Sequence, residues 1–337
     1  MRNLGKTALR VTELGFGGAP LGNLFAVVTE ADAQASLAAA WDSGCRFFDT
    51  APLYGYGLSE RRVGDALREE PRDQYVLSSK VGRLIRPGAE GRGGGTDFQS
   101  PMPFFAKFDY SYDATMRSIE DSLQRLGIER IDVALIHDVG RDWHGDQQPA
   151  MMRQAMSGAA KALMELKANG QIGAIGLGVN EVEPCEQAMQ EADFDCFLLA
   201  GRYTLLEQAP LDRFFPACQK RNISIIIGGP FNSGLLARLG QPDATYNYGA
   251  VPPEIAKRAA ALHEACTRHN VPLPAAAVQF PLAHPVVAAV IPGARNAAEV
   301  KSHWQWARLK IPSALWEDLR TQGLLHKEAP VPQGPVL

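Results

Sequence analysis

The stretch FFDTAPLYGYG, residues 47–57, begins as an apolar run and then changes character. Asp49 ends the run, and Tyr54 follows five residues later in a loop broken by glycines. An apolar run closed by polar residues is typical of a buried strand that leads into a loop. Two interpretations follow: an ordinary strand with a polar turn, or a strand end that brings Asp49 and Tyr54 to one site.

The same alternation of apolar run and helical pattern recurs along the chain. Apolar runs predict eight strands, at residues 11–17, 46–51, 75–80, 131–137, 172–178, 195–200, 223–228 and 286–292. Amphipathic stretches lie between them, and this alternation indicates parallel strands buried on both faces. Eight such units in 337 residues predict an α/β protein with a closed (β/α)8 barrel. An open doubly wound sheet of six or seven strands is the competing fold.

The predicted domain organisation is one barrel, residues 1–328, followed by a Pro-rich tail, 329–337, that we expect to be extended or disordered. Three long strand-to-helix loops interrupt the alternation, at 82–110, 138–157 and 229–251. In a (β/α)8 barrel such loops lie at the C-terminal face of the strands, where active sites are built. We therefore expect the active site at that face.

The composition is that of an ordinary globular protein, with 46% hydrophobic residues, 21% charged residues and a net charge of −3. This charge gives no support to nucleic acid or an anionic membrane as a partner. No apolar run reaches the roughly 18 residues of a membrane-spanning helix, and we expect no signal peptide. The five cysteines lack metal-finger spacing, which together with the other features predicts a reduced, cytoplasmic protein.

Polar residues close three consecutive predicted strands. Asp49 lies near the end of the second strand with Tyr54 in the loop after it, Lys80 ends the third, and His137 ends the fourth. Taken singly, each has an ordinary structural explanation: a loop-capping acid, a surface aromatic, a solvated charge and a core histidine. Because neighbouring strand ends of a barrel meet at one rim, we expect the four side chains to surround one cavity.

The four side chains have complementary chemistry. A phenol with a pKa near ~10 is a poor acid or base at neutral pH, and a neighbouring ammonium lowers that pKa. Asp49 would hold Lys80 charged and directed at Tyr54, and His137 would hydrogen-bond and orient a substrate oxygen. None of the four is arranged as a covalent nucleophile. The set therefore predicts proton transfer to or from an oxygen.

Six segments carry a resemblance to a known family. They are GFGGAPLG (15–22), FFDTAPLYGYGLSERRVGDAL (47–67), SSKVG (78–82), SIEDSLQRLGIERIDVALIHD (118–138), GLGVN (176–180) and VIPGAR (290–295). In this order the segments resemble those of the aldo-keto reductases. The resemblance implies a (β/α)8 barrel, hydride transfer with NAD(P), and a catalytic tetrad of Asp49, Tyr54, Lys80 and His137 in which Tyr54 is the acid/base.

A Rossmann domain is another way to hold a nicotinamide cofactor, and its fingerprint is GxGxxG. GFGGAP (15–20) has Pro20 at the third glycine, and GLGVNE (176–181) has Glu181 there. Neither segment matches the fingerprint. We interpret these glycines as positions at the barrel rim where backbones pack closely.

In the family that this sequence resembles, an extended cofactor lies across the C-terminal face of the barrel. Asn180 matches the residue that bonds the carboxamide, although Val179 and Ala200 replace the usual serine and glutamine beside it. Gly228 falls near the usual place of an aromatic that stacks on the nicotinamide, so Tyr203 is either its replacement or a core residue. The implied cofactor-binding residues are Gly18, Asp49, Asn180, Gly229, Pro230, Phe231, Asn232, Gly234, Leu235, Gly293, Arg295, Glu299 and His303.

The choice between NAD and NADP depends on the charge near the adenosine ribose. Glu299 stands where phosphate-binding relatives carry arginine, and its carboxylate would repel a 2′-phosphate. Arg295 argues the other way, because a guanidinium can hold a phosphate. His303 stands where the family often places a residue against the adenine, with a surface histidine as the alternative. We favour NAD over NADP.

Residues 107–123, the pair His137–Asp138 and residues 198–206 resemble the branch of aldose 1-dehydrogenases and pyridoxal 4-dehydrogenase. The implied reaction oxidises the anomeric hydroxyl of an aldose of the L-fucose, D-arabinose or L-galactose type to the lactone. The alternatives are a pyridoxal 4-dehydrogenase that forms 4-pyridoxolactone, and an NADPH-dependent aldehyde or ketone reductase. The expected substrate pocket consists of Tyr54, His137, Phe104, Phe105, Trp143, His144 and Arg202.

Two other classes of protein compete with this interpretation. One is a barrel that has lost its catalytic activity and serves only as a binding module. The intact tetrad argues against this class. The other is a metal-dependent barrel with His137 and His144 as ligands, but no HxH or HExxH spacing supports it, so we predict no metal. The resembling family includes monomers and dimers, which leaves the oligomeric state at monomer or homodimer.

Overall fold

The computed structural model describes residues 1–88, 98–240 and 244–337. Residues 89–97 and 241–243, which belong to two of the predicted long loops, lie outside the described residues. One sheet contains eight strands, each parallel to its neighbours. In spatial order the strands are β3 (Phe16–Gly17), β4 (Phe47–Asp49), β5 (Val76–Val81), β8 (Val133–His137), β9 (Ala174–Val179), β10 (Cys196–Ala200), β11 (Ser224–Gly228) and β12 (Val287–Ile291).

The sheet closes into a barrel between its first and last strands. Parallel bridges join Leu14 to Val290 and Gly17 to Gly293. The N–H of Gly15 donates to the carbonyl of Val290 at 2.9 Å, and the N–H of Val290 donates to the carbonyl of Glu13 at 2.8 Å. The predicted (β/α)8 barrel is confirmed, and the open doubly wound sheet is wrong.

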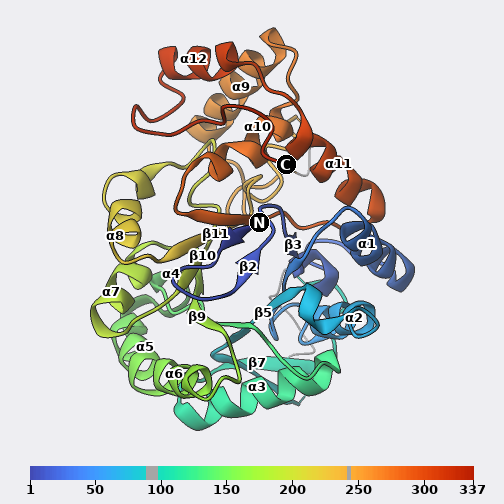
Figure 1. The fold of residues 1–337 in the computed structure, drawn as a ribbon, viewed down its shortest axis with the longest axis vertical. Coiled ribbons are helices and arrows are strands. Elements are labelled where there is room, and N and C mark those ends of the chain that lie inside the picture. The colour runs from blue at the N-terminus through green and yellow to red at the C-terminus, as the bar shows by residue number, and fades with distance from the viewer. Residues whose placement is uncertain (89–97, 241–243) are drawn as a thin grey trace.

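Each predicted strand overlaps one barrel strand, but the first prediction joined two different elements. Val11 belongs to a hairpin of β1 (Arg2–Asn3) and β2 (Arg10–Val11), and only Phe16–Gly17 enters the barrel. Figure 1 shows this hairpin over the centre of the barrel. Its side chains Leu4 and Val11 pack with Phe47 and Val133 inside the barrel, so the hairpin closes the N-terminal end.

Helices surround the barrel (Figure 1). Several begin at a side-chain cap: Thr29, Ser111 and Asn296 each accept a hydrogen bond from a backbone N–H of the first turn. The predicted loop 138–157 contains two short helices and part of a π-helical turn, η5 (Ala155–Ala160), which leads into α6. The helices are α1 (Glu30–Asp42), α2 (Leu58–Leu67), α3 (Tyr112–Leu126), α4 (Arg141–His144), α5 (Gln148–Gln154), α6 (Lys161–Ala168), α7 (Glu183–Glu191), α8 (Phe214–Lys220), α9 (Pro253–Arg268), α10 (Leu273–Gln279), α11 (Ala297–Arg308) and α12 (Ser313–Thr321).

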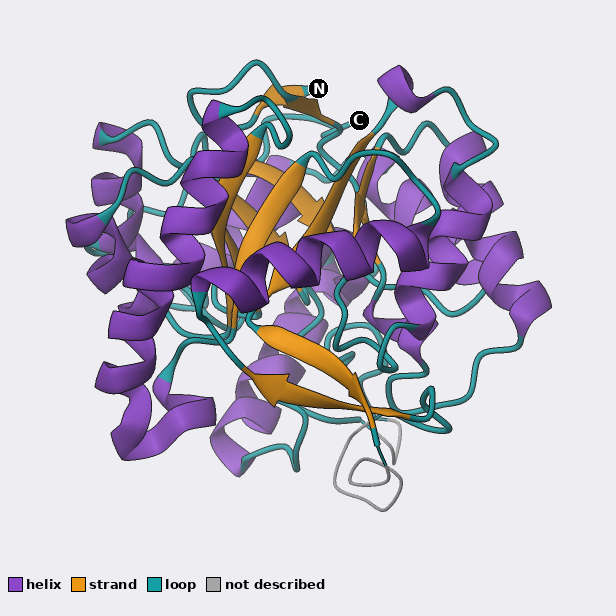
Figure 2. Ribbon diagram, turned by 90° about the horizontal axis from the view of Figure 1, so that it is seen from below, coloured by secondary structure: helices purple, strands orange, loops and turns teal. Residues whose placement is uncertain are grey.

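The loop after β5 contains a hairpin that the sequence did not predict. Strand β6 (Arg83–Pro87) pairs antiparallel with β7 (Phe104–Phe108). Figure 2 shows this hairpin at the end of the barrel opposite the two chain termini. Because it directly follows the C-terminal end of β5, it forms part of the face where the active site was expected.

Residues 329–337 contain no helix or strand. Ala329 is buried, and Arg320 donates to its carbonyl at 2.8 Å, so the start of the tail packs on the body of the protein. In the part of the chain that the structure describes, no helix combines the length and apolar character needed to cross a bilayer.

Candidate active site

The strand ends that were predicted to meet lie together. Asp49 in β4, Lys80 in β5 and His137 in β8 stand on three neighbouring barrel strands, and all three side chains are buried. Lys80 Nζ donates to Asp49 Oδ1 at 2.9 Å and Oδ2 at 2.7 Å, and to the carbonyl of Thr50 at 2.9 Å. A buried ammonium must be paired in this way to offset its lost hydration.

Tyr54 lies in the loop after β4, between Lys80 and His137. Lys80 Nζ stands 4.8 Å from the centroid of the Tyr54 ring, a cation–π distance. The His137 ring meets the Tyr54 ring edge-on, with centroids 6.0 Å apart. The three hydrogen bonds of Lys80 go to Asp49 and Thr50, so Lys80 meets Tyr54 at its ring face.

The protonation states of the two candidate proton-handling groups follow from burial. Burial raises the pKa of Tyr54 well above 10.0, and the Asp49 carboxylate raises it further. The expected net lowering of this pKa is therefore not found, because desolvation dominates. Burial lowers the pKa of His137 well below 6.5, and the Lys80 and Arg83 charges act in the same direction. At neutral pH Tyr54 is therefore a phenol and His137 a neutral imidazole.

A cavity of about 720 Å³ opens onto this cluster. It extends from Asp49 and Tyr54 to Arg295 and Glu299 at the start of α11. Its middle part is lined by Ala200 and other residues at the ends of β10 and β11. This volume lies within the range of ordinary ligand pockets.

Most of the predicted cofactor-binding residues line this cavity, namely Asp49, Gly229, Pro230, Phe231, Gly234, Gly293, Arg295, Glu299 and His303. Four others do not line it. The N–H of Gly18 donates to the carbonyl of Asp49 at 2.7 Å, and Asn232 donates to the carbonyl of Gly201 at 3.2 Å. Asn180 Nδ2 lies 3.5 Å from the carbonyl of Ala200, and Leu235 is buried in the core.

The outer end of the cavity is aromatic. The rings of Phe231, His303 and Trp306 lie with centroids 5.4 to 5.9 Å apart. His303 is buried, so the surface alternative is wrong, and burial lowers its pKa to about 4. Trp306 was not predicted, although its position three residues after His303 places both on one side of α11.

Arg295 and Glu299 form an ion pair at this end. Arg295 Nη2 and Nε lie 2.7 and 3.1 Å from Glu299 Oε1, and the Arg295 backbone N–H donates to Oε2 at 2.8 Å. Although burial opposes it, these hydrogen bonds hold the pKa of Glu299 below its ordinary value. The guanidinium and the carboxylate thus neutralise each other beside the cavity.

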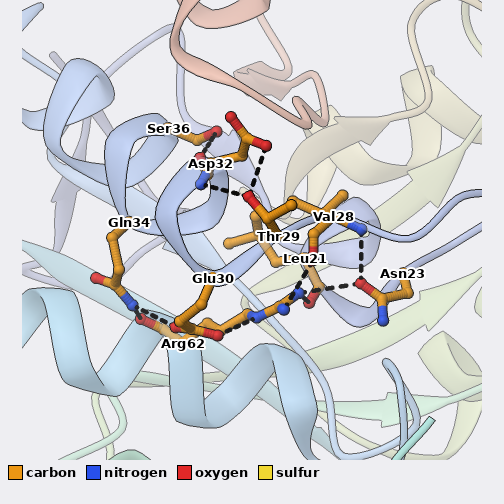
Figure 3. A network of polar contacts seen from close by, with 9 residues as sticks. All are labelled: Leu21, Asn23, Val28, Thr29, Glu30, Asp32, Gln34, Ser36 and Arg62. Carbon is orange, nitrogen blue, oxygen red and sulfur yellow. Dashed lines mark hydrogen bonds and ion pairs between the residues drawn. The ribbon is translucent and has the colours of Figure 1, made fainter. Parts of the chain in front are cut away.

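The loop after β3 forms another wall, through Leu24, Phe25 and Ala26. Figure 3 shows how Arg62 of α2 holds this loop. Its guanidinium donates to the carbonyls of Leu21 at 2.8 Å and Val28 at 2.9 Å, and also to Asn23 Oδ1 and Glu30. The Phe25 ring then lies 6.0 Å from that of Tyr248, in the loop after β11. The two loops therefore meet at the cavity.

Strand register separates the two phenylalanines predicted for the substrate pocket. Phe104 pairs with Pro87 and Phe108 with Arg83, so both share the face of the hairpin that Arg83 occupies. Phe105 lies on the opposite face, since side chains alternate along a strand. Phe108, which was not predicted, stacks under the Arg83 guanidinium at 4.3 Å.

Trp143 and His144, also predicted for the substrate pocket, contact residues of the β6–β7 hairpin and Tyr110. The Trp143 ring lies 3.9 Å from the Arg83 guanidinium, and His144 Nε2 lies 3.0 Å from Tyr110 Oη. Tyr110 Oη in turn donates to the carbonyl of His137 at 2.9 Å. His144 is thus linked through Tyr110 to the backbone of His137, and Trp143 contacts Arg83.

Arg202 and Tyr203 are placed elsewhere. Arg202 bonds Asn247 Oδ1 at 3.0 Å and lines a separate groove of about 780 Å³. Tyr203 is fully buried against Phe215 and Phe280. It is therefore a core residue and does not stack on a nicotinamide. Within the described residues, no group of three or more His, Cys, Asp or Glu side chains has the geometry of a metal site.

Comparisons with known proteins give the family to which this chain is similar. The model of the Aldo/keto reductase family matches residues 13–321. A pyridoxal 4-dehydrogenase from Microbacterium luteolum is 44% identical, over 96% of this chain and 97% of its own length. A D-threo-aldose 1-dehydrogenase from Pseudomonas sp is 40% identical, over 94% of this chain and 95% of its own. The solved holo form of aldo-keto reductase AKR11C1 from Bacillus halodurans matches with a TM-score of 0.75 and 26% identity, over 100% of this chain and 99% of that one.

Proposed function

Because this chain belongs to the aldo/keto reductase family, we propose that it is an NAD-dependent dehydrogenase that oxidises the anomeric hydroxyl of an aldose to the lactone. One observation carries the proposal. Asp49 and Tyr54 line one end of a cavity whose other end holds Arg295 and Glu299, and Lys80 and His137 contact them from behind that end. Proton-transfer groups and an extended binding cavity meet at Tyr54.

The residues of the cavity fit a dinucleotide. Five glycines line it: Gly17, Gly228, Gly229, Gly234 and Gly293. A Cβ on Gly228 would come within 3.2 Å of Leu198, so a larger residue there would crowd the middle of the cavity. Phe231, His303 and Trp306 would hold an adenine. When bound, the oxidised nicotinamide supplies the acceptor for the hydride.

The chain's own residues handle the proton. A sugar hydroxyl placed between Tyr54 and His137 loses its proton to the phenolate form of Tyr54, the minor form at neutral pH, while the hydrogen on the same carbon leaves as hydride. His137, a neutral imidazole, donates an N–H to the substrate oxygen and orients it. Asp49 pairs with Lys80 and holds it beside Tyr54. Oxidising a cyclic hemiacetal in this way yields a lactone directly.

The preference for NAD rests on the Arg295–Glu299 pair. A 2′-phosphate would have to displace the Glu299 carboxylate from Arg295, against like-charge repulsion. A ribose hydroxyl instead donates to a carboxylate without that cost. NADP remains the second cofactor candidate.

Pyridoxal is the second candidate substrate, and the relative of 44% identity is a pyridoxal 4-dehydrogenase. The aromatic side chains of Phe108 and Trp143 lie near His137, around Arg83, and could pack against a pyridine ring as well as against a sugar. An NADPH-dependent reductase of aldehydes is the third candidate, since a protonated Tyr54 is ready to donate a proton.

We further propose that the enzyme works in the cytoplasm, as a monomer or homodimer and as a single barrel domain over residues 1–328. All five cysteines are free and buried, which favours a reducing compartment.

Initial rates with L-fucose, D-arabinose, L-galactose and pyridoxal, each with NAD and with NADP, test the proposal. We expect NAD-linked formation of lactone from an aldose, reduced about 10²- to 10⁴-fold in Tyr54→Phe. Tyr112→Phe, a tyrosine on the outer helix α3 that bonds Glu165, is the matched control and keeps full activity. A rate with pyridoxal alone would favour the second candidate. Activity only with simple aldehydes and NADPH would contradict the dehydrogenase.

A further inference from the structure

A buried ion pair stands beside His137 and has no part in the proton transfer described above. Asp138 follows His137 directly, and Arg83 begins β6. Arg83 Nη2 donates to Asp138 Oδ2 at 2.7 Å, and only 7% and 6% of the two side chains are exposed. Burying two charges is costly, and such a pair is weak evidence for stability alone. Its place beside a catalytic residue suggests a role in the reaction.

The surroundings hold both partners firmly. The Arg83 guanidinium packs over the rings of Trp143, at 3.9 Å, and Phe108, at 4.3 Å, which are tilted against each other. The backbone of Asp138 is left-handed, with φ of 52°, a conformation that non-glycine residues seldom adopt. Its N–H donates to the carbonyl of Gly178 at 3.0 Å, and its carbonyl accepts from Tyr110 Oη at 3.0 Å. The fold thus keeps Asp138 in this position against a backbone preference.

The carboxylate faces one nitrogen of the histidine. Asp138 Oδ2 lies 3.4 Å from His137 Nε2, a contact longer than a strong hydrogen bond. His137 Nδ1 is buried and has no hydrogen-bond partner among the described residues. Nε2 is therefore the nitrogen left to meet a substrate oxygen. A neutral imidazole carries one proton, and which nitrogen holds it decides whether Nε2 can donate.

We propose that Asp138 is a positioning residue that keeps the proton of His137 on Nε2, and that Arg83 neutralises Asp138 beside the reacting oxygen. The carboxylate 3.4 Å away favours a proton on Nε2 but is too distant to hold it against a substrate oxygen, whereas a proton on Nδ1 would be a buried donor without an acceptor. An unpaired carboxylate at this place would repel negative charge on the substrate oxygen. The positive charge of Arg83 offsets that repulsion, and the ion pair keeps the carboxylate oriented towards His137.

The inference rests on the proposed function, since it assigns the pair to the same reaction, but its first test does not need turnover. The ¹⁵N chemical shifts of the two ring nitrogens report which one is protonated. The full chain, labelled with ¹⁵N-histidine and loaded with NAD, has seven histidines, and His137→Gln identifies the signals of His137. We expect Nε2–H in the wild type and a shift towards Nδ1–H in Asp138→Asn. A wild type protonated on Nδ1, or a tautomer unchanged in Asp138→Asn, would overturn the proposal.

The second test is a double-mutant cycle on kcat. We expect Asp138→Asn to lower kcat about tenfold, and Arg83→Gln to lower it further because the carboxylate is then unpaired. In the double variant the loss should fall back to that of Asp138→Asn. If the kcat loss of the double variant equals the product of the two single losses, Arg83 does not act by neutralising Asp138. Arg86→Gln, three residues further along β6 and on its other face, is the matched control.

The two tests separate the possible failures. An enzyme that oxidises none of the sugars would contradict the proposed function, while the NMR result would still decide the tautomer. Normal sugar oxidation with an unchanged tautomer would contradict only the inference. If Arg83→Gln does not fold, Asp138→Asn decides by NMR, since asparagine keeps the shape of the side chain.

Discussion

A Cβ built on Gly22 would lie 2.4 Å from the carbonyl carbon of Tyr54 and 2.6 Å from the backbone nitrogen of Gly55. The loop after β3 and the loop that carries Tyr54 therefore touch backbone to backbone, with no room for a side chain. This contact helps to set where the phenol stands relative to Lys80 and His137.

We expect Gly22→Ala to push the Tyr54 loop away and to lower kcat about 10- to 100-fold, since small displacements of catalytic groups are costly. Steady-state kinetics measure the loss. Gly334→Ala is the control, because nothing lies within 4 Å of a Cβ there. A Gly22→Ala enzyme with wild-type kcat would show that this contact does not position Tyr54.

Arg62 is expected to stabilise the protein and the cavity together. Arg62→Met leaves the carbonyls of Leu21 and Val28 without their donor (Figure 3), which should cost about 2 to 4 kcal/mol in the free energy of unfolding. The loop 21–28 should also loosen, so that the KM for the cofactor rises. Urea denaturation and cofactor titration measure the two effects. Arg61→Met, its exposed neighbour, should change neither, and equal effects of the two substitutions would contradict the role of the network.

Glu299→Gln tests the basis of cofactor choice. Without the carboxylate, Arg295 becomes free to bind a 2′-phosphate, so the ratio of kcat/KM for NAD to that for NADP should fall about tenfold or more. Glu254→Gln removes an acid from the first turn of α9 in the same way and should leave the ratio unchanged. A ratio that stays constant in Glu299→Gln would mean that the Arg295–Glu299 pair does not select the cofactor.

The pKa of Tyr54 predicts opposite pH profiles for the two directions of the reaction. Burial raises this pKa well above 10.0, so the phenol predominates at neutral pH and the phenolate fraction grows as the pH rises. Oxidation needs the phenolate as proton acceptor, and its kcat/KM should increase between about pH 6 and pH 9. Reduction needs the phenol and should stay level over the same range. An oxidation rate that falls with rising pH would contradict Tyr54 as the base.

The positions of the barrel strands could be predicted because each is a short apolar run that both faces of the sheet bury. The hairpin β6–β7 could not, since its strands flank a stretch rich in glycine and proline, and a two-stranded ribbon has no periodic burial to reveal it. For the same reason the contact between Phe108 and Arg83 could not be predicted, since it depends on the register of the two strands. The position of Arg202 also differs from the one predicted. Although Arg202 follows a barrel strand, its loop turns the side chain towards another groove.

The sequence by itself determined which side chains reach the C-terminal ends of neighbouring strands, and therefore that Asp49, Lys80 and His137 meet. That follows from strand order, which local patterns encode. Only the tertiary structure decided which distant charges are paired, because Lys80 is held by Asp49 and Arg83 by Asp138. Ion pairs of the kind between Arg83 and Asp138 join residues far apart in the chain, so their strength depends on burial and distance that no local pattern contains.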